Sequence, residues 1–569
     1  MKNYKILFVF LFFFLLFILL FGAFLFLSIV KPPSYFSPVT TKVKLAMRGN
    51  IFTKRYTVAK SEKIYAVSIN PSFIDPLKKT LFINLFSIYA DVDKSKLRKL
   101  LKSKKYIMLA KVDLKTAQNL KYLLKVLDKK RAFIADKNGI RRGYYIEDFA
   151  FKRVYPYNDT LEPVLGRYIK DKKINENGLE EYYDSFLSPR QNGIVKGNRD
   201  VYGNIIYDKD AYIVHPVNGG NLKLNINLVL QRKIEKLLSL QKQKFKADEV
   251  MASVMDTKTG KILAIASSNR YNPNFVRKKD IKNMKIGFIR TLYEPGSVMK
   301  PIIFAILLDN NKVNPYEVLN AYNGKWKPKW RRTYIIDDKP FKWLSAENAL
   351  VYSSNIVISQ LALRLTNTEY YKGLVNFGLG QKSGIDLPYE LKGYIRSMTK
   401  LNYPIYKSTT AYGYGIMVNF MQLLKAYNSF NNQGVEITPK IADVPTTSHR
   451  VMSAKNASLL RGILRKIVLK GTAQKAFVQG IFTAGKTGTA QRSVQGVYGK
   501  TYNSSFFGFA DDNNHKYTIA VTFINIKAKW PNYFASSSAV PTFKKIVDIM
   551  LQLNLLKRMK DNELSSQTY

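Results

Sequence analysis

The stretch Glu294-Pro295-Gly296-Ser297-Val298-Met299-Lys300-Pro301 leads into the apolar run Ile302-Ile303-Phe304-Ala305-Ile306-Leu307-Leu308. Pro-Gly is a turn signal, so the chain is predicted to turn there and to enter a helix near Ser297. Residues three apart share a helix face, so the Lys300 amine can reach the Ser297 hydroxyl. A buried lysine with a lowered pKa can take the proton of a serine, which is otherwise a weak nucleophile. Free N–H groups in the first helical turn could stabilise an oxyanion. The stretch therefore predicts a serine nucleophile with a lysine base.

The Ser-x-x-Lys motif alone is weak evidence for this chemistry, because a chain rich in both residues contains many such pairs on solvated helix surfaces.

The few histidines of the chain limit which residue could act as the base for a serine. Only His215, His449 and His515 are present, far apart and outside any metal-binding pattern. A Ser-His-Asp hydrolase and a zinc enzyme are therefore disfavoured. Cysteine is absent, which excludes disulfides and thiolate nucleophiles. We expect no metal site and no cofactor.

Positive charge dominates this chain of 569 residues, with 91 Lys and Arg against 40 Asp and Glu and a formal net charge of +51. Nucleic-acid binding is one interpretation of such a charge. No zinc-finger spacing, RNP-like segment or recognition-helix pattern supports it, and the lysines are spread along the whole chain. We therefore predict no nucleic-acid partner. A basic surface still attracts anionic lipids or an acidic polymer.

Residues 6–30 form an almost unbroken apolar run. At ~1.5 Å per residue this run can cross a hydrocarbon core of ~30 Å. A cleaved signal peptide is the alternative, but its apolar region is only about 7–15 residues long and a small-x-small cleavage site follows it. We therefore predict a retained single-pass anchor after a cytoplasmic tail at residues 1–5. Lys2 and Lys5 favour this orientation, whereas the lysines that follow the run make the charge signal mixed.

The remainder of the chain has two parts of different character. After the linker prolines Pro32, Pro33 and Pro38, the first part is charged, with a short strand predicted at residues 64–69 and helical stretches within residues 94–127. It contains no catalytic constellation and is interpreted as a spacer. The second part begins with a predicted helix at residues 226–240, becomes rich in helices between the Ser297 region and about residue 430, and ends with a helix at residues 542–553. Its predicted strands cover residues 250–256, 262–267, 484–490, 504–510 and 517–526. Strands at both ends with helices between them indicate one α+β domain.

Two further motifs complete the predicted chemistry. Ser353-Ser354-Asn355 lies at a predicted helix junction, and Lys486-Thr487-Gly488-Thr489 lies on a predicted strand. Ser-x-x-Lys, Ser-Asp-Asn and Lys-Thr-Gly in this order are the mark of β-lactamases and penicillin-binding proteins. Here the second motif carries Ser in place of Asp. Each motif alone is weak, but all three in order, on the expected elements, are strong evidence.

With these motifs and their flanks, the chain resembles a class B penicillin-binding protein, a bitopic peptidoglycan DD-transpeptidase. The resemblance covers nearly the whole chain. The matching flanks are Arg48-Gly49-Asn50-Ile51, Tyr65-Ala66-Val67, Pro71, Arg153-Val154-Tyr155-Pro156, Gly178-Leu179-Glu180, Asp256, Gly260, Ala264, Gly413-Tyr414-Gly415, Gln422, Asn432-Gln433-Gly434 and Pro439. Two segments depart from the family pattern. Thr53-Lys54-Arg55-Tyr56 stands where the family has Asp-Arg-Asn-Gly, and Asn225-Ile226-Asn227 stands where it has Thr-Ile-Asp. These departures put the spacer contacts in doubt rather than the reaction.

The resemblance implies a role for each motif residue. Ser297 would be the acylated nucleophile and Lys300 its base. Ser353 would relay a proton to the leaving amine, and Asn355 would hold the substrate amide and the lysine side chains. The terminal carboxylate of the substrate would be bound by Lys486, Thr487 and Thr489, with Gly488 permitting close approach of the backbone. The backbone N–H groups of Ser297 and Thr489 would form the oxyanion hole.

The resemblance also implies the organisation, location and partners of the protein. It predicts a transmembrane helix at residues 6–30, an elongated pedestal or dimerisation-like domain at 31–215, a transpeptidase domain at 216–555 and a C-terminal tail at 556–569. The transpeptidase domain would have an antiparallel sheet with helices on both sides. It would lie in the periplasmic or extracellular space, anchored in the bacterial inner (cytoplasmic) membrane. The substrate would be a stem peptide ending in D-Ala-D-Ala, and β-lactams would be covalent inhibitors. A polytopic glycosyltransferase and membrane proteins of the division complex would be partners.

The motifs look more like the division (septal) type than the elongation type, which more often lacks the Glu before Pro-Gly-Ser and varies the other two motifs. An elongation enzyme and a non-catalytic division scaffold stay open as alternatives. A scaffold would have no need to keep every motif position. A β-lactamase needs a base for a deacylating water, and no clear Glu-x-x-x-Asn element is present. A β-lactam sensor would need several membrane spans, and one is predicted.

Overall fold

The computed structural model describes residues 3–29, 39–135, 139, 141–169, 178–198, 205–494 and 497–560. The predicted linker prolines and residues 561–569 of the predicted C-terminal tail lie outside the described residues. The chain forms two compact units that interleave in sequence. One comprises Met1–Arg48, Lys63–Phe151 and Pro189–Gly219, and the other Gly49–Glu62, Lys152–Ser188 and Gly220–Tyr569. The domain boundaries predicted from the sequence stay a prediction.

The predicted anchor is a single helix, α1 (Asn3–Ile29). Within it, the 20 residues of Leu7–Phe26 are long and apolar enough to cross a membrane, and among the described residues α1 is the one helix that meets this condition. Its described side chains are exposed, as expected of a helix that no other part of the protein covers.

The first unit has a hydrophobic core of its own, to which side chains of α2, α4, β3 and β4 contribute. The strand predicted at residues 64–69 is the end of the longer β3. Residues 94–127 contain two helices, as predicted, but also the unpredicted strand β4. Its short apolar run, Ile107-Met108-Leu109-Ala110, fits a helix as well as a strand. The elements of this unit, including β3 and β5 whose residues continue into the other unit, are β1 (Thr40–Lys44), β3 (Thr57–Ile69), α2 (Lys79–Ala90), α3 (Lys94–Leu100), β4 (Ile107–Val112), α4 (Leu114–Lys129), β5 (Tyr145–Val154), β6 (Gly193–Gly197) and β7 (Tyr212–Val214).

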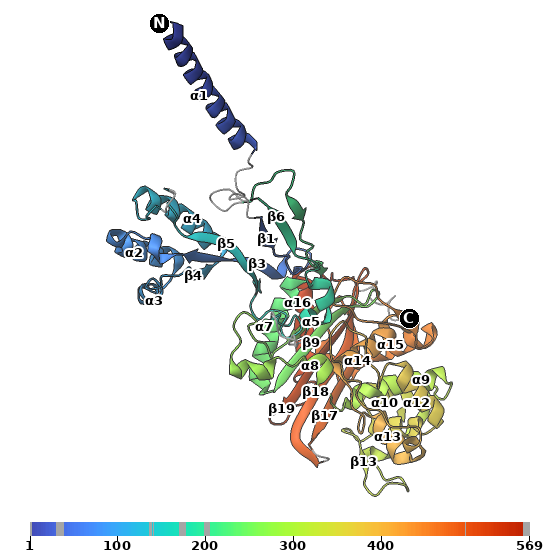
Figure 1. The fold of residues 1–569 in the computed structure, drawn as a ribbon. Coiled ribbons are helices and arrows are strands. Elements are labelled where there is room, and N and C mark those ends of the chain that lie inside the picture. The colour runs from blue at the N-terminus through green and yellow to red at the C-terminus, as the bar shows by residue number, and fades with distance from the viewer. Residues whose placement is uncertain are drawn as a thin grey trace. The chain divides into compact units, whose positions relative to one another are not determined.

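The second unit is built on a five-stranded antiparallel sheet in the order β10-β9-β19-β18-β17 (Figure 1). All five strands were predicted, and the sheet combines strands from distant parts of the sequence. The strands are β9 (Glu249–Asp256), β10 (Ile262–Ser267), β17 (Phe482–Val494), β18 (Val497–Asp511) and β19 (Lys516–Ile526). β17 is an edge strand, so one of its two edges has no neighbouring strand among the described residues and can face the helices.

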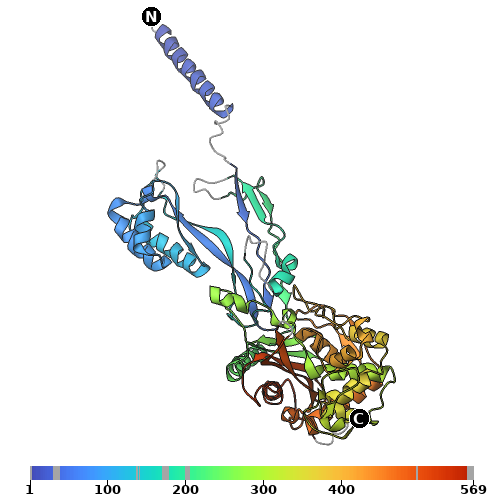
Figure 2. The ribbon, with the colours of Figure 1, turned by 90° about the horizontal axis from the view of Figure 1, so that it is seen from below.

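Helices cover both faces of this sheet (Figures 1 and 2). Successive side chains of a strand point to opposite faces. On β18, Phe506 contacts Phe543 of α16 (Ala539–Gln552), with ring centroids 4.8 Å apart. The next residue, Phe507, contacts Phe420 of α14 (Phe420–Asn431), with centroids 5.4 Å apart. The fold class predicted from the sequence, α+β with an antiparallel sheet between helices, is confirmed.

The other elements of the second unit are mostly the helices between β10 and β17 and short strand pairs beside them. The strands are β2 (Ile51–Phe52), β8 (Leu222–Lys223), β11 (Val318–Asn320), β12 (Lys325–Trp326), β13 (Ile335–Ile336), β14 (Trp343–Ser345), β15 (Val435–Ile437) and β16 (Ser448–Arg450). The helices are α5 (Leu179–Tyr182), α6 (Asp184–Leu187), α7 (Leu228–Phe245), α8 (Gly287–Arg290), η4 (Gly296–Met299), α9 (Lys300–Asp309), α10 (Ala346–Val351), α11 (Asn355–Ala362), α12 (Asn367–Asn376), α13 (Pro404–Ala411) and α15 (Ala454–Lys470).

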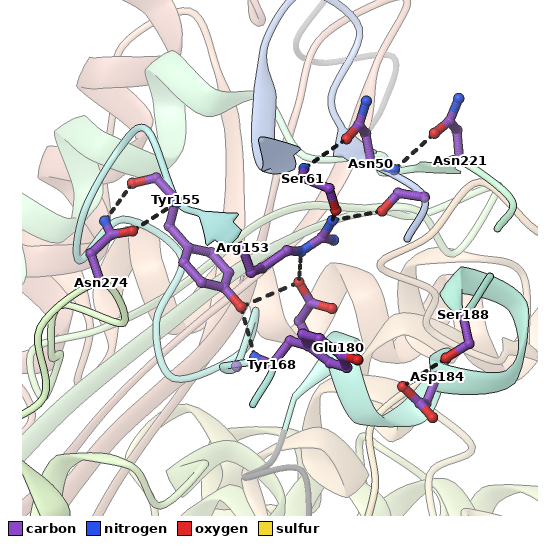
Figure 3. A network of polar contacts seen from close by, with 12 residues as sticks. Asn50, Ser61, Arg153, Tyr155, Tyr168, Glu180, Asp184, Ser188, Asn221 and Asn274 are labelled. Atoms are coloured by element: carbon purple, nitrogen blue, oxygen red, sulfur yellow. Dashed lines mark hydrogen bonds and ion pairs between the residues drawn. The ribbon is translucent and has the colours of Figure 1, made fainter. Parts of the chain in front are cut away.

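A buried polar network joins the flanking motifs of the second unit (Figure 3). Arg153 Nε donates to Glu180 Oε1 at 2.6 Å, and Arg153 Nη1 donates to the Gly49 carbonyl at 2.7 Å. The side chains of Arg153 and Glu180 are 4% and 0% exposed. Tyr155 exchanges two hydrogen bonds with Asn274, which follows β10. Three motifs that are distant in sequence are thus tied to one another and to the segment after β10.

Candidate active site

Ser297 lies in the short 3-10 helix η4, which continues directly into α9. Gly296 adopts a positive φ of 61° at the entry, a conformation that favours glycine. Ser297 is half-buried, whereas Lys300, three residues later, is 0% exposed. The apolar residues 301–308 of α9 are all buried, which is why this run forms a helix inside the unit rather than on its surface. The predicted turn and helix entry are therefore observed.

The second motif lies at the junction between α10 and α11, as predicted. Ser353 has a left-handed backbone, with φ of 64°, which is unusual for a residue other than glycine. α11 then begins at Asn355. The third motif lies on β17, and its Lys486 is 0% exposed.

The hydroxyl of Ser353 lies between two lysines. Lys300 Nζ donates to Ser353 Oγ at 3.1 Å and to the Ser353 carbonyl at 2.5 Å. Lys486 Nζ donates to the same Oγ at 2.9 Å and to the Thr487 carbonyl at 3.1 Å. Side chains of all three motifs thus meet at one hydroxyl group.

This meeting point borders a cavity of about 420 Å³. The motif residues that line it are Ser297, Ser353, Thr487 and Thr489, while Lys300 and Lys486 lie behind Ser353. The other lining residues, none of which the sequence analysis assigned to the site, are Asp338, Lys339, Tyr414, Thr472, Gln491, Tyr502, Tyr533, Phe534, Ala535 and Ser536. A larger cavity of about 560 Å³ lies between α9 and α12 and is lined by none of the three motifs.

Burial changes the electrostatics of both lysines. It lowers the pKa of Lys300 to about 8, and the nearby carboxylates Asp337 and Asp338 oppose this shift. It lowers the pKa of Lys486 well below its ordinary value, and the positive charge of Lys300 lowers it further. A lysine with a pKa near 8 has a substantial neutral fraction close to neutral pH, so Lys300 can accept a proton.

The backbone of β17 approaches the nucleophile segment closely. A Cβ added to Gly488 would lie 2.8 Å from Val298 Cγ1 and 2.9 Å from the Pro295 carbonyl. Tyr427 of α14 donates to the Val298 carbonyl at 2.7 Å and holds η4 from another side. Glycine at position 488 therefore lets η4 pack directly onto the strand.

Two motif side chains have partners that differ from the predicted ones. The side-chain amide of Asn355 donates to the Ile336 carbonyl at 2.8 Å, and among the described residues it makes no hydrogen bond with either lysine. Lys300 was expected to contact Ser297, whereas its hydrogen bonds among the described residues go to Ser353. The roles assigned to both residues stay predictions.

The residues that the sequence analysis missed carry weak local signals. Thr472 Oγ1 and Thr487 Oγ1 share a hydrogen bond of 2.8 Å, and Ala535 N donates to Thr489 Oγ1 at 3.0 Å. The rings of Tyr502 and Tyr533 stack with centroids 4.0 Å apart. These contacts join loops to strands over long sequence distances, so no pattern along the chain could have identified them.

Comparisons with known proteins identify the family of the chain. The penicillin-binding protein transpeptidase domain matches residues 250–548, and the penicillin-binding protein dimerisation domain matches residues 43–224. Peptidoglycan D,D-transpeptidase FtsI of Buchnera aphidicola is 28% identical over 70% of this chain and 69% of its own length. Stage V sporulation protein D of Bacillus subtilis is 29% identical over 75% of this chain and 68% of its own length.

A solved structure, penicillin-binding protein 2X of Streptococcus thermophilus, aligns with a TM-score of 0.73 and 20% identity over 90% of this chain and 81% of its own. At this identity the likeness concerns the fold alone. The transpeptidase match, however, covers more than half of the chain and contains all three motifs. The chain therefore belongs to the penicillin-binding protein transpeptidase family, and with its dimerisation domain it is a class B penicillin-binding protein.

Proposed function

We propose that this protein is a serine-type peptidoglycan D,D-transpeptidase that cross-links stem peptides through an acyl-enzyme on Ser297. The observation that carries this proposal is the Ser353 hydroxyl between the two buried lysines, at the border of a cavity that Ser297 also lines. The family match and the names of the relatives agree with this reaction.

Acylation begins when Lys300 Nζ, in its neutral form, takes the proton of Ser297 Oγ. The oxygen attacks the carbonyl carbon between the two terminal D-Ala residues, and a C–O bond forms. The C–N bond then breaks, and the leaving amine receives a proton from Lys300 through the Ser353 hydroxyl. The hydrogen bond between Lys300 and Ser353 supports this relay. An amine of a second stem peptide then attacks the ester, releases Ser297 and completes the cross-link.

Recognition of the substrate is assigned to the β17 side of the cavity. The terminal carboxylate would be bound by the hydroxyl groups of Thr487 and Thr489, with the charge of Lys486 behind them. The backbone N–H groups of Ser297 and Thr489 would stabilise the oxyanion, and Asn355 would bind the peptide amide. Because a penicillin presents a comparable carboxylate and a reactive carbonyl, β-lactams are the expected covalent inhibitors.

The site of action is inferred to be the division septum. FtsI and stage V sporulation protein D are among the relatives. The Glu294-Pro295-Gly296-Ser297 sequence favours the division type over the elongation type. α1 would anchor the protein in the inner (cytoplasmic) membrane, with a cytoplasmic N-terminus and the catalytic unit in the periplasmic or extracellular space. A polytopic glycosyltransferase and other division proteins of the membrane are the expected partners. A fluorescent fusion at midcell supports this assignment, whereas labelling along the whole cell body contradicts it and favours the elongation type.

The reaction is tested by mass spectrometry of the purified full-length protein after exposure to a fluorescent penicillin. We expect one covalent adduct, on the peptide that contains Ser297, and none in Ser297→Ala with an unchanged melting temperature. Ser537→Ala, which changes a serine near the cavity but outside its lining, is the matched control and should label normally. An adduct on another serine, or no adduct on the wild type, contradicts the proposal.

A further inference from the structure

Asp337 is a buried carboxylate beside the second motif, in the turn after β13. No sequence motif includes it, and its side chain is one of the few acidic groups close to the two lysines. Asp337 Oδ1 accepts hydrogen bonds from the backbone N–H groups of Asn355, at 2.5 Å, and Ile356, at 3.1 Å. Asp337 Oδ2 accepts the hydroxyl of Ser354 at 2.5 Å. Both carboxylate oxygens are thus used on the segment that carries the motif.

These bonds fix the start of α11. The first N–H groups of a helix have no partner within the helix, and a carboxylate at this end is favoured by the helix dipole. Ser354 Oγ accepts from Val357 N at 3.1 Å while it donates to Asp337, so its hydroxyl is held from both sides. The turn is therefore fastened to Asp337 at three consecutive residues, Ser354, Asn355 and Ile356.

Ser353, the next residue toward the N-terminus, depends on this turn. Its left-handed backbone costs roughly 1–3 kcal/mol and persists only where the surroundings impose it. Its carbonyl and its hydroxyl are the two groups that bind Lys300, and its hydroxyl also binds Lys486. A change in the direction of the turn would move both groups away from the lysines.

We propose that Asp337 is a positioning residue for acylation, because its carboxylate fastens the turn that holds the Ser353 hydroxyl and carbonyl against Lys300. This inference rests on the proposed function. Asp337 is not among the residues that line the cavity; it acts through Ser354 and Asn355 on Ser353.

The charge of Asp337 adds an effect that can be measured separately. Among the described residues, the charged groups that face Lys300 are Lys486 of β17 and the carboxylates Asp337 and Asp338 of the turn between β13 and β14. Asp337 is the larger of the two carboxylate influences that hold the pKa of Lys300 up against burial. Removing its charge should lower the pKa of Lys300 further, so that the base becomes neutral at a lower pH.

The experiment measures the rate constant of acylation by a fluorescent penicillin as a function of pH, on the full-length protein. Asp337→Asn removes the charge but keeps one acceptor oxygen, and Asp337→Ala removes the charge and both acceptors. We expect the plateau rate to fall about tenfold in Asp337→Asn and about a hundredfold in Asp337→Ala, which corresponds to losses of about 1.4 and 2.7 kcal/mol. We also expect the midpoint of the pH profile to move to lower pH in both.

Two other variants separate positioning from general effects. Asp338→Asn removes the charge of the neighbouring residue, whose side chain makes no hydrogen bond within the described ranges. This variant should lower the midpoint of the pH profile by less than Asp337→Asn does. It should also lose less of the plateau rate than Asp337→Ala does. Asp309→Ala removes a carboxylate that lies in the same unit but away from the cavity. This carboxylate accepts hydrogen bonds from the backbone N–H of Ser453 and the side-chain amide of Asn456 at the start of α15. Asp309→Ala should lower the melting temperature, and its pH profile of acylation should be the same as that of the wild type.

The inference is overturned if both Asp337 variants keep the plateau rate and the midpoint of the wild type and lose only thermal stability, as Asp309→Ala does. If Asp337→Ala does not fold, Asp337→Asn alone decides between the two outcomes. Failure of the proposed function is distinguishable, because the wild-type protein would then form no acyl-enzyme at any pH.

Discussion

The Nζ of Lys486 donates a hydrogen bond to the Oγ of Ser353 at 2.9 Å, across 133 residues of sequence. The same Oγ accepts a hydrogen bond from Lys300, so one hydroxyl is held by two buried cations or by one cation and one neutral amine. Because the positive charge of Lys300 lowers the pKa of Lys486, the arrangement favours loss of one proton from the pair. The geometry thus provides both a base for the nucleophile and a charged neighbour for an anionic substrate.

The first prediction concerns pH. Only the neutral form of Lys300 can accept the serine proton, and burial places its pKa at about 8. The neutral fraction increases as the pH rises through this value, so the rate constant of acylation should increase and then level off above it. The measurement is the initial rate of covalent penicillin incorporation at a series of pH values. Lys300→Arg, whose side chain stays protonated, should be inactive throughout. A rate that is flat or falls across the same interval contradicts the assignment of Lys300 as the base.

The second prediction concerns the close packing of Gly488 against η4. A Cβ in Gly488→Ala would meet a backbone carbonyl and a branched side chain at 2.9 and 2.8 Å, and neither can withdraw without moving η4. Overpacking of this kind costs roughly 1–3 kcal/mol of stability. We expect a further loss of about tenfold or more in acylation, since Ser297 moves with η4. Acylation rate and melting temperature are both measured.

Gly499→Ala is the matched control for this variant. Gly499 lies on β18, and a Cβ there would meet its nearest atom, the Arg492 carbonyl, at 3.9 Å, an ordinary contact. It should acylate at the wild-type rate. Equal losses in Gly488→Ala and Gly499→Ala would mean that the hairpin tolerates no side chain at either position and that the contact with η4 is not the cause.

The third prediction concerns the buried pair of Arg153 and Glu180 (Figure 3). Removing one partner of a buried pair leaves the other charge without compensation and costs roughly 3–5 kcal/mol. Glu180→Gln should therefore lower the melting temperature of the second unit strongly, measured by calorimetry of the full-length protein in detergent. Lys60→Ala breaks the exposed pair with Glu62 and should cost about 1 kcal/mol or less. Similar shifts for the two variants would show that the buried pair contributes little.

The sequence predicted the parts of the protein whose signals are local. The apolar run of α1, the five strands of the central sheet and the helix entry at Ser297 all follow from periodicity and turn residues. That the three motifs form one site was inferred from a family pattern, because spacing along a chain does not state how strands and helices pack. The strand β4 was missed because a short apolar run fits two kinds of element.

Other features of the site had no signal in the sequence. Asp337 acts through a turn between two short strands, and its importance appears only when α11 is seen to begin against it. The interleaving of the two units likewise depends on long-range packing. Residues 49–62 and 152–188 belong to the second unit, which contains the five-stranded sheet. The departure at Thr53-Lys54-Arg55-Tyr56 lies beside Asn225 and Leu553 around a cavity of about 480 Å³, a grouping that no local pattern indicates.

The fourth prediction concerns topology. α1 is long and apolar enough to cross a membrane, and Lys2 and Lys5 precede it. A reporter that is active only outside the cytoplasm, fused after Tyr569, should therefore be active, and the protein should stay in the membrane fraction. The same reporter fused after Lys2 is the control and should be inactive. An inactive reporter after Tyr569 contradicts the orientation, and cleavage near residue 30 contradicts a retained anchor.

The last prediction separates chemistry from recognition at Lys486. Thr487 and Thr489 line the cavity, whereas Lys486 is fully buried and reaches Ser353 from behind. A bound carboxylate favours the protonated form of Lys486, so the effect of Lys486 on the substrate is mainly electrostatic and does not need direct contact. A peptide that ends in an uncharged amide lacks this attraction. Lys486→Ala should therefore slow acylation by the acid more than acylation by the amide of the same peptide.

Two unit charges roughly 8 Å apart at an effective dielectric constant of about 20 interact by about 2 kcal/mol, so the extra loss for the acid should be about ten- to a hundredfold. The acylation rates of acid and amide, in the wild type and in Lys486→Ala, form a double-mutant cycle whose coupling energy isolates this attraction. Lys339→Ala is the comparison, since Lys339 lines the cavity but is exposed, and water screens its charge. Its coupling energy should be much smaller. If Lys486→Ala slows acid and amide equally, Lys486 organises the Ser353 hydroxyl and does not recognise the carboxylate.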